Sequence, residues 1–129
     1  MVRAAPDAGY WDMLIKRSVS RFFLLAALSE GPRHGYKLAR AVRDACAGCC
    51  QPSDAMVYPT LQALEEEGYI SCQVEHTGAR KRKVCCLTEK GKEYYRQAAQ
   101  AWGRFLPHLA QAVEQAEKKE ADYGCCEET

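Results

Sequence analysis

The sequence predicts a mainly α-helical fold with one small β-hairpin, and three patterns along the chain support it. Residues 53–67 form a helical pattern that begins at a polar cap. Two alternating, strand-like segments flank the turn Thr77-Gly78-Ala79. A second helical pattern begins at Thr88. This order of elements is typical of a winged helix-turn-helix that is followed by a C-terminal helix.

Two more helices are expected ahead of this region. Apolar residues recur at helical spacing from Met13 to Ser29, and Gly31-Pro32 ends the segment. A second helix runs from about His34 to Cys46, with one apolar side and one basic side that includes Lys37. The basic side suits contact with nucleic-acid phosphate and simple exposure to solvent equally well.

The pattern from Ser53 to Glu67 predicts the recognition helix of the motif. Ser53 is a natural N-cap, and the negative charge of Asp54 is favourable near the positive end of the helix dipole. The N-terminal end of such a helix usually enters the major groove of DNA. We therefore expect DNA contacts from the first residues of this helix, among them Ser53, Asp54, Met56 and Tyr58.

Four adjacent cations follow the turn between the two strand-like segments, namely Arg80, Lys81, Arg82 and Lys83. No acidic residue interrupts this run, so the like charges repel one another unless an anion lies nearby. A solvated basic loop at a hairpin tip is one interpretation. We favour the other, in which the hairpin is a wing that holds the phosphate backbone of nucleic acid.

The helical pattern from Thr88 is the longest in the chain and predicts a dimerisation helix. Its apolar residues follow a 4-3-4-3-4 spacing, which keeps them on one side of a helix where a second helix can cover them. This apolar stripe consists of Ala98, Trp102, Phe105, Leu109, Ala112 and Ala116. We expect a winged domain over residues 1–87, the dimerisation helix over 88–120 and a flexible cysteine-containing tail over 121–129.

Length and charge are consistent with one DNA-binding domain. The 129 residues have a formal net charge of +1, but residues 1–105 hold 16 Lys and Arg against 11 Asp and Glu, whereas residues 106–129 hold 2 against 6. The basic part is the part expected to meet DNA. No stretch approaches the roughly 20 apolar residues of a membrane span, and the N-terminus has no signal-peptide core. We therefore expect a cytoplasmic protein with no membrane partner.

Several short motifs in the sequence resemble the PadR family of bacterial transcriptional regulators. They are GPRHGYKL at 31–38, VYPTL at 57–61, LEEEGYI at 64–70, and RK at 82–83 followed by LTEKG at 87–91. The resemblance spans about residues 13–105. It implies a homodimeric repressor with an N-terminal winged helix and a C-terminal dimerisation helix, bound to double-stranded DNA at a palindromic operator. It also implies that Tyr58 and its neighbours lie at the operator, and that Arg80, Arg82 and Lys83 lie on the wing.

The chain contains eight cysteines. Cytoplasmic thiols are kept reduced, so we expect no disulfide framework, and metal, metalloid or redox chemistry becomes the alternative to plain burial. Cys46, Cys49 and Cys50 have the spacing i, i+3, i+4, which brings three sulfurs to one face of a helical turn. Three thiolates suit a soft centre such as trivalent arsenic or antimony, or a soft divalent metal.

Two vicinal pairs are further candidate ligands, Cys85 with Cys86 and Cys125 with Cys126. The side chains of neighbouring residues in a strand point to opposite faces, so Cys85 and Cys86 bind one ion only if the strand is distorted. Cys72 lies almost opposite this pair when counted back from the turn. For Cys72 and for one of Cys85 and Cys86, we expect burial as a small hydrophobic residue.

We therefore expect a repressor that a thiophilic ion releases from DNA. The alternatives for the cysteines are structural zinc, thiol redox sensing and packing alone. Trp102 offers a competing site, because the family resemblance implies that some members bind flat aromatic, drug-like compounds at such a residue; it is otherwise an anchor of dimer packing. We assign no role to His34, His76 and His108.

An enzyme is not expected, because the sequence offers neither a nucleophile with its base nor a glycine-rich phosphate loop. The alternative to a DNA-binding repressor is a protein-interaction or metal-buffering module, which would use the same fold without binding an operator. Affinity for DNA with a steep salt dependence distinguishes the two.

Overall fold

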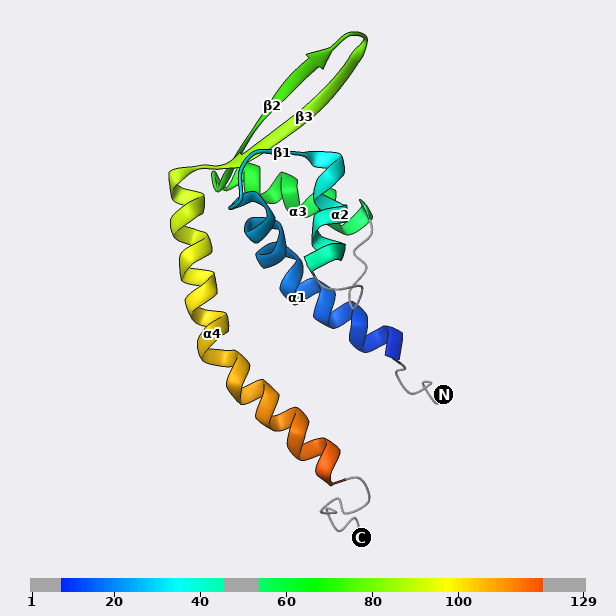
Figure 1. Ribbon diagram of the computed structural model, residues 1–129, viewed down its shortest axis with the longest axis vertical. Helices are drawn as coiled ribbons and strands as arrows, with labels where there is room; N and C mark the ends of the chain where they lie inside the picture. The colour runs from blue at the N-terminus through cyan, green and yellow to red at the C-terminus, as the bar shows by residue number, and fades with distance from the viewer. Residues whose placement is uncertain (1–7, 46–53, 120–129) are drawn as a thin grey trace. The chain divides into compact units, whose positions relative to one another are not determined.

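A computed structural model describes residues 8–45 and 54–119 of the chain. The described residues form a mainly helical structure with a small antiparallel sheet, as expected. Its elements, shown in Figure 1, are α1 (Ala8–Leu28), β1 (Arg33–His34), α2 (Gly35–Ala45), α3 (Asp54–Glu66), β2 (Ile70–Thr77), β3 (Arg80–Leu87) and α4 (Glu89–Lys118).

The sheet has three strands in the order β1-β3-β2. Its short strand β1 pairs Arg33 with Cys85 and His34 with Val84. A strand of two residues has no alternation that a sequence can reveal, and the prediction had placed His34 inside a helix. The helix α2 begins one residue later, at Gly35.

The strands β2 and β3 form a long hairpin that projects away from the helices (Figure 1). Eight residue pairs join the strands, from Ile70 opposite Leu87 at the inner end to Thr77 opposite Arg80 at the outer end. Gly78 closes the outer turn with a φ of 65°, a conformation that residues with a side chain adopt reluctantly. The hairpin has the shape of a wing, and we call it the wing from here on.

The core lies where α1, α2 and α3 face one another and meet the inner end of the wing. Each helix presents apolar residues at helical spacing, and burial of a Leu-sized side chain stabilises by about 1.5–3 kcal/mol. The largest fully buried side chains are Leu24, Leu25, Leu28, Leu38, Val42, Val57, Leu64 and Cys85. This core fixes α3 against the sheet, so α3 and the wing are held by the same set of contacts.

A tight junction joins the end of α3 to the start of α4. Gly68 has a φ of 85° and ends α3, while the amide of Tyr69 donates to the carbonyl of Leu64 at 2.9 Å. Thr88 then caps α4, since its hydroxyl accepts a hydrogen bond from the Gly91 amide at 3.0 Å and donates one to the Gly68 carbonyl at 2.7 Å. The expected helix start at Thr88 is therefore its N-cap.

Arg21 of α1 ties the same junction to the core. Its guanidinium donates hydrogen bonds to the Glu67 carboxylate and to the Tyr94 hydroxyl, both at 3.1 Å. The bond to Glu67 is the main cause that raises the pKa of Arg21 above its ordinary value. The first turns of α4 are thus fastened to α1 and to the end of α3.

The chain divides into two compact units between Arg96 and Gln97, so that α4 begins in one unit and ends in the other. Each unit is described by itself below. Among the described residues, none of the helices is long and apolar enough to span a membrane.

Candidate nucleic-acid interface

The wing presents its four cations along a strand. Arg80, Lys81, Arg82 and Lys83 all lie in the outer half of β3, opposite residues 74–77 of β2. The four cations thus lie on a strand of the hairpin, and the turn itself is formed by Gly78 and Ala79. A strand spaces successive residues by about 3.3 Å, so the four charges extend along the wing and do not crowd at its end.

Arg82 is held by an aromatic residue of α2. Its guanidinium donates a hydrogen bond to the Tyr36 hydroxyl at 2.9 Å and lies 5.1 Å from the centroid of the same ring. The ammonium of Lys37 lies 5.8 Å from this ring, and the His34 ring lies 5.4 Å from it. Tyr36 is 50% exposed, so it orders Arg82 without removing it from solvent.

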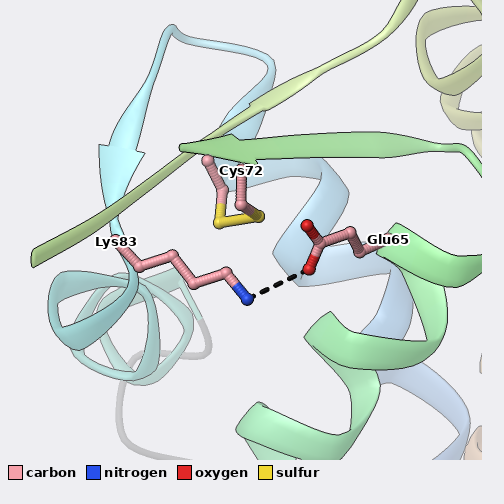
Figure 2. Close-up of a disulfide and its surroundings, with 4 residues drawn as sticks. Glu65, Cys72 and Lys83 are labelled. Carbon is pink, nitrogen blue, oxygen red and sulfur yellow. Dashed lines mark hydrogen bonds and ion pairs between the residues drawn. A yellow bond between two sulfur atoms is a disulfide. The ribbon is translucent and has the colours of Figure 1, made fainter. Parts of the chain in front are cut away.

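Lys83 is paired with a residue of α3. Its ammonium forms an ion pair with the Glu65 carboxylate of α3 at 3.0 Å (Figure 2). Both side chains are partly exposed, so the pair stabilises the fold by less than about 1 kcal/mol. Its effect is geometric, because it links the wing to α3. In the described part of the chain the side chains of Arg80 and Lys81 make no ion pair or hydrogen bond, and both are exposed.

The basic side of α2 lies beside the wing contact. Lys37 and Arg40 are exposed, and Arg43 is half-buried. With Arg33 and Tyr36 they line a hollow of about 690 Å³ between α1 and α2. The Arg33 side chain donates to the Ala27 carbonyl and pairs with Glu30, which leaves the α2 cations as the charges that face outward.

A cleft of about 580 Å³ separates α3 from the wing. Its polar and aromatic lining consists of Tyr36, Tyr58, Gln62, Lys81 and Lys83 together with the carboxylates of Glu65 and Glu66. Tyr58 lies in the second turn of α3 and is 46% exposed. Among the residues of this helix that were predicted to contact DNA, Tyr58 is the one whose side chain the structure describes. Asp54 and Met56 lie in the first turn of α3, and Ser53 lies outside the described residues.

The cysteines of the sheet are bonded to each other. Cys72 of β2 and Cys85 of β3 face each other in the ladder with their Cα atoms 4.0 Å apart, and their sulfurs form a disulfide (Figure 2). The expectation that the cysteines stay reduced is wrong at this pair, because cross-strand register brings the two sulfurs within bonding distance. Cys85 is also buried in the core, so in this structure it is not a free thiolate for a metal.

Cys86 is the one free cysteine within residues 8–45 and 54–119. It lines a separate hollow with Leu28 and Tyr95, on the face of β3 away from the disulfide, as strand alternation requires. Cys46, Cys49, Cys50, Cys125 and Cys126 lie outside the described residues. In the described ranges no group of three or more His, Cys, Asp or Glu side chains is arranged to hold a metal ion.

The second unit consists of the C-terminal part of α4 and has an exposed apolar side. Of the predicted stripe, Ala98 and Trp102 are half-buried, and Phe105, Leu109, Ala112 and Ala116 are exposed. Leu106 and Val113, which lie next to the stripe, are 50% and 51% exposed. The Trp102 and Phe105 rings pack edge to face at 6.1 Å and, with Ala101, line an apolar hollow of about 290 Å³.

Sequence reasoning missed the roles of Tyr36 and Glu65 on this surface, and it placed Cys72 correctly but did not expect its disulfide. Tyr36 stands next to Lys37 in a basic helix, and an aromatic residue beside cations is a signal for cation–π contact. The pairing of Glu65 with Lys83 has no sequence signal, because the two residues belong to different elements. Cys72 was placed opposite the vicinal pair, but reduction in the cytoplasm was given more weight than register.

The comparisons with known proteins agree with this geometry. Transcriptional regulator YqjI of Escherichia coli (strain K12) is 35% identical over 74 residues, which are 57% of this chain and 34% of the relative. The chain thus covers about a third of that protein's length. Among solved structures, a PadR family transcriptional regulator from Eggerthella lenta DSM 2243 has a TM-score of 0.71 at 21% identity, over 82% of this chain and 91% of the other.

A second structure, the PadR-like transcriptional regulator BC4206 from Bacillus cereus strain ATCC 14579, has a TM-score of 0.66 at 22% identity, over 78% of this chain and 96% of the other. At these identities the two structures support the fold alone. The family model described as "Transcriptional regulator PadR-like family" matches residues 24–97, which is more than half of the chain. The protein therefore belongs to the PadR-like family of transcriptional regulators.

Proposed function

We propose that the protein is a homodimeric repressor that binds a palindromic operator with α3 in the major groove and the wing on the phosphate backbone. The observation that carries this proposal is the row of four cations along β3, one of which, Arg82, is ordered by Tyr36. Regulators of the PadR-like family bind DNA, and an ordered cation loses less conformational entropy on reaching a phosphate than a free one.

The cleft between α3 and the wing supports the same binding mode. Its lining includes Tyr36, Tyr58, Lys81 and Lys83, which offer cations and hydroxyl donors to a sugar-phosphate strand, beside Glu65, which is paired with Lys83, and Glu66. The basic side of α2, with Lys37 and Arg40, would extend the contact on the other side of Tyr36. Such contacts fix the position of a protein on DNA without specifying sequence, and sequence reading is left to the first turns of α3.

A dimer is supported by the apolar side of α4. Phe105 and Leu109 of the stripe, together with Leu106 and Val113, are 43–51% exposed. A cluster of large apolar side chains on one side of a solvent-exposed helix indicates an interface, because soluble monomers rarely expose contiguous apolar surface. Two copies paired through this helix would present two recognition helices, which is what a palindromic operator requires.

The salt dependence of DNA binding tests the wing. The variant Arg82→Ala/Lys83→Ala removes two cations from each protomer, and each phosphate contact contributes about 0.9 to the slope of log K against log salt. A dimer that engages both wings should lose up to about 3.6 from that slope. The measurement is fluorescence anisotropy of a labelled random-sequence duplex over a range of salt concentrations.

The matched control is Lys92→Ala/Arg96→Ala, which removes the same charge from exposed positions of α4 away from the wing. It should retain nearly the whole slope, because non-contacting charges release few counterions. Equal slopes for the wing variant and the wild type would refute the assignment of the wing. Absence of salt-dependent binding in the wild type would favour a protein-interaction or metal-buffering module.

For the effector, we propose a thiophilic ion, such as trivalent arsenic or antimony or a soft divalent metal, that releases the protein from its operator. The support is the i, i+3, i+4 spacing of Cys46, Cys49 and Cys50, with Cys125, Cys126 and Cys86 as further candidate thiols. One observation favours a second effector class. The apolar hollow beside Trp102 and Phe105 offers a ring-sized surface for a flat aromatic compound.

A titration of the protein–DNA complex under reducing conditions separates the two effector classes. Arsenite, antimonite, cadmium and a panel of aromatic drugs are added to the wild type and to two variants. Release by arsenite that is lost in the Cys46→Ser/Cys49→Ser/Cys50→Ser variant supports the ion. Release by aromatic compounds alone, lost in Trp102→Ala, supports the aromatic effector and overturns the ion.

A further inference from the structure

We infer that Cys72 and Cys85 form a redox modification site, a dithiol that a disulfide oxidant closes, and that closure of the bond raises the affinity of the wing for DNA. The inference rests on the proposed DNA-binding function, whose regulation it names. The two residues are direct partners in the β2–β3 ladder, with their Cα atoms 4.0 Å apart and their sulfurs bonded (Figure 2). Residues opposite each other in an antiparallel ladder have Cα atoms about 4.5–5.5 Å apart, so the bond closes after a small approach of the two strands.

The pair lies at the inner end of the wing. Cys85 is 1% exposed and belongs to the core cluster, and on its other side it pairs with Arg33 of β1. Residues 73–84, which lie outward of the bond, include all four cations of β3. The disulfide is therefore the boundary between the part of the sheet that the core holds and the part proposed to contact DNA.

Outward of this boundary few buried contacts hold the wing. Val74 is 57% exposed, and Arg80, Lys81 and Lys83 are exposed as well. A two-stranded hairpin without a packed face is marginally stable in water. Two side-chain contacts hold the outer cations, Lys83 with Glu65 and Arg82 with Tyr36. Both of these cations lie within three residues of Cys85 along β3. A covalent bond at the inner end keeps β3 in register and so keeps both contacts aligned.

The chemistry is a thiol–disulfide exchange. A thiolate of one of the pair attacks a sulfur of a low-molecular-weight disulfide such as glutathione disulfide, and one glutathione leaves. The second thiolate then attacks the mixed disulfide, so that one glutathione disulfide becomes two glutathiones while the two protein thiols lose two electrons and two protons. Cys72 is half-buried and therefore the more accessible of the two sulfurs, both when the disulfide forms and when it is reduced. Cys85 also lines the cleft between α3 and the wing.

Cys86 does not take part in this exchange. It faces the opposite side of β3 and lines another hollow, so its sulfur is directed away from the bonded pair. This separation allows the pair to be tested alone. In a reference variant, Cys46, Cys49, Cys50, Cys86, Cys125 and Cys126 are all changed to Ser, and Cys72 and Cys85 remain.

The test compares this pair-only variant with the same variant carrying Cys72→Ser. Each is equilibrated with glutathione disulfide or with dithiothreitol, and mass spectrometry after alkylation reports whether the bond is present. Binding is measured by anisotropy with a duplex that the wild type has selected from a random-sequence pool. The oxidised pair-only variant should bind at least about fivefold more tightly than its reduced form, the lower end of common coupling strengths. The Cys72→Ser variant should bind equally in both conditions.

Amide hydrogen exchange provides a readout that does not depend on DNA. Reduction of the pair-only variant should accelerate exchange in residues 73–84 and leave the core helices unchanged. Equal exchange and equal affinity in the two redox states, with the bond verified, would overturn the inference, as would a bond that fails to form in glutathione disulfide. If no duplex is bound in either state while exchange still responds, the redox effect on the wing stands and the DNA-binding proposal fails.

Discussion

The substitution Leu109→Asp tests the proposed dimer at the centre of its apolar stripe. Leu109 is 43% exposed within α4, and its neighbours Phe105, Leu106 and Val113 are 50%, 50% and 51% exposed. An interface formed by this side of the helix would remove these side chains from water. A carboxylate at position 109 would then lose its water without gaining a partner charge. The free-energy cost of this desolvation adds to the loss of the apolar contact.

The magnitude follows from the symmetry of a dimer. Leu109 is 43% exposed, so burial of its exposed part contributes about 0.6–1.3 kcal/mol per copy and about 1.3–2.6 kcal/mol for the two copies. The dimer dissociation constant should therefore rise by at least about 10-fold, and the unpaired carboxylate adds to this effect. Since the substitution lies in the unit formed by residues 97–129, the fold of residues 8–96 should be unaffected.

Sedimentation velocity over a micromolar concentration series is the assay, with circular dichroism as a check that the variant is folded. Gln111→Asp is the matched control, because it adds the same charge to an exposed position of α4 outside the stripe. A Leu109→Asp variant that remains as dimeric as the control would refute the assignment of the stripe. A wild type that sediments as a monomer would refute the dimer itself.

Two further substitutions, Gly91→Ala and Tyr36→Phe, test contacts of the winged unit, and Gly103→Ala in the second unit is the control for the first. Gly91→Ala places a Cβ 1.9 Å from the Tyr69 carbonyl oxygen and should destabilise the protein by about 1–3 kcal/mol in urea unfolding. Gly103→Ala, where nothing lies within 4 Å, should instead stabilise α4 by about 0.5–1 kcal/mol; the reverse order would contradict the close approach at Gly91. Tyr36→Phe removes the acceptor of Arg82 but keeps the ring, so DNA affinity should fall by about 2- to 10-fold, the value of one hydrogen bond. Unchanged affinity in an anisotropy titration would show that the hydroxyl does not organise Arg82 for DNA.

The elements of this fold were predictable where one residue pattern extends over a whole element. The polar cap and apolar spacing of α3 and the glycine turn of the wing all have local signals, and the structure has both elements within a few residues of their expected limits. Where the signal was weak, the prediction was less accurate. The start of α1 at Ala8 was missed, since Tyr10, Trp11 and Met13 are apolar yet 40–60% exposed and do not mark a core-facing side.

The features of the site that escaped prediction depend on contacts between elements. The contacts of Arg82 with Tyr36 and of Lys83 with Glu65 join the wing to α2 and α3, which are distant in the sequence. The disulfide follows from the register of the ladder, because Cys72 and Cys85 are opposite each other only when Gly78 and Ala79 form the turn. A sequence shows which cations and cysteines are present, but register decides which of them face each other.

Hydroxyl-radical footprinting on a duplex selected from a random-sequence pool tests the central claim most directly. A dimer with two recognition helices and two wings should protect two symmetric patches of backbone whose centres are one helical turn, about 10–10.5 base pairs, or a multiple of it apart. The Arg82→Ala/Lys83→Ala variant should lose protection at the outer edge of each patch, where the wings would lie. A single asymmetric patch, or protection that is identical in the wing variant, would contradict the account.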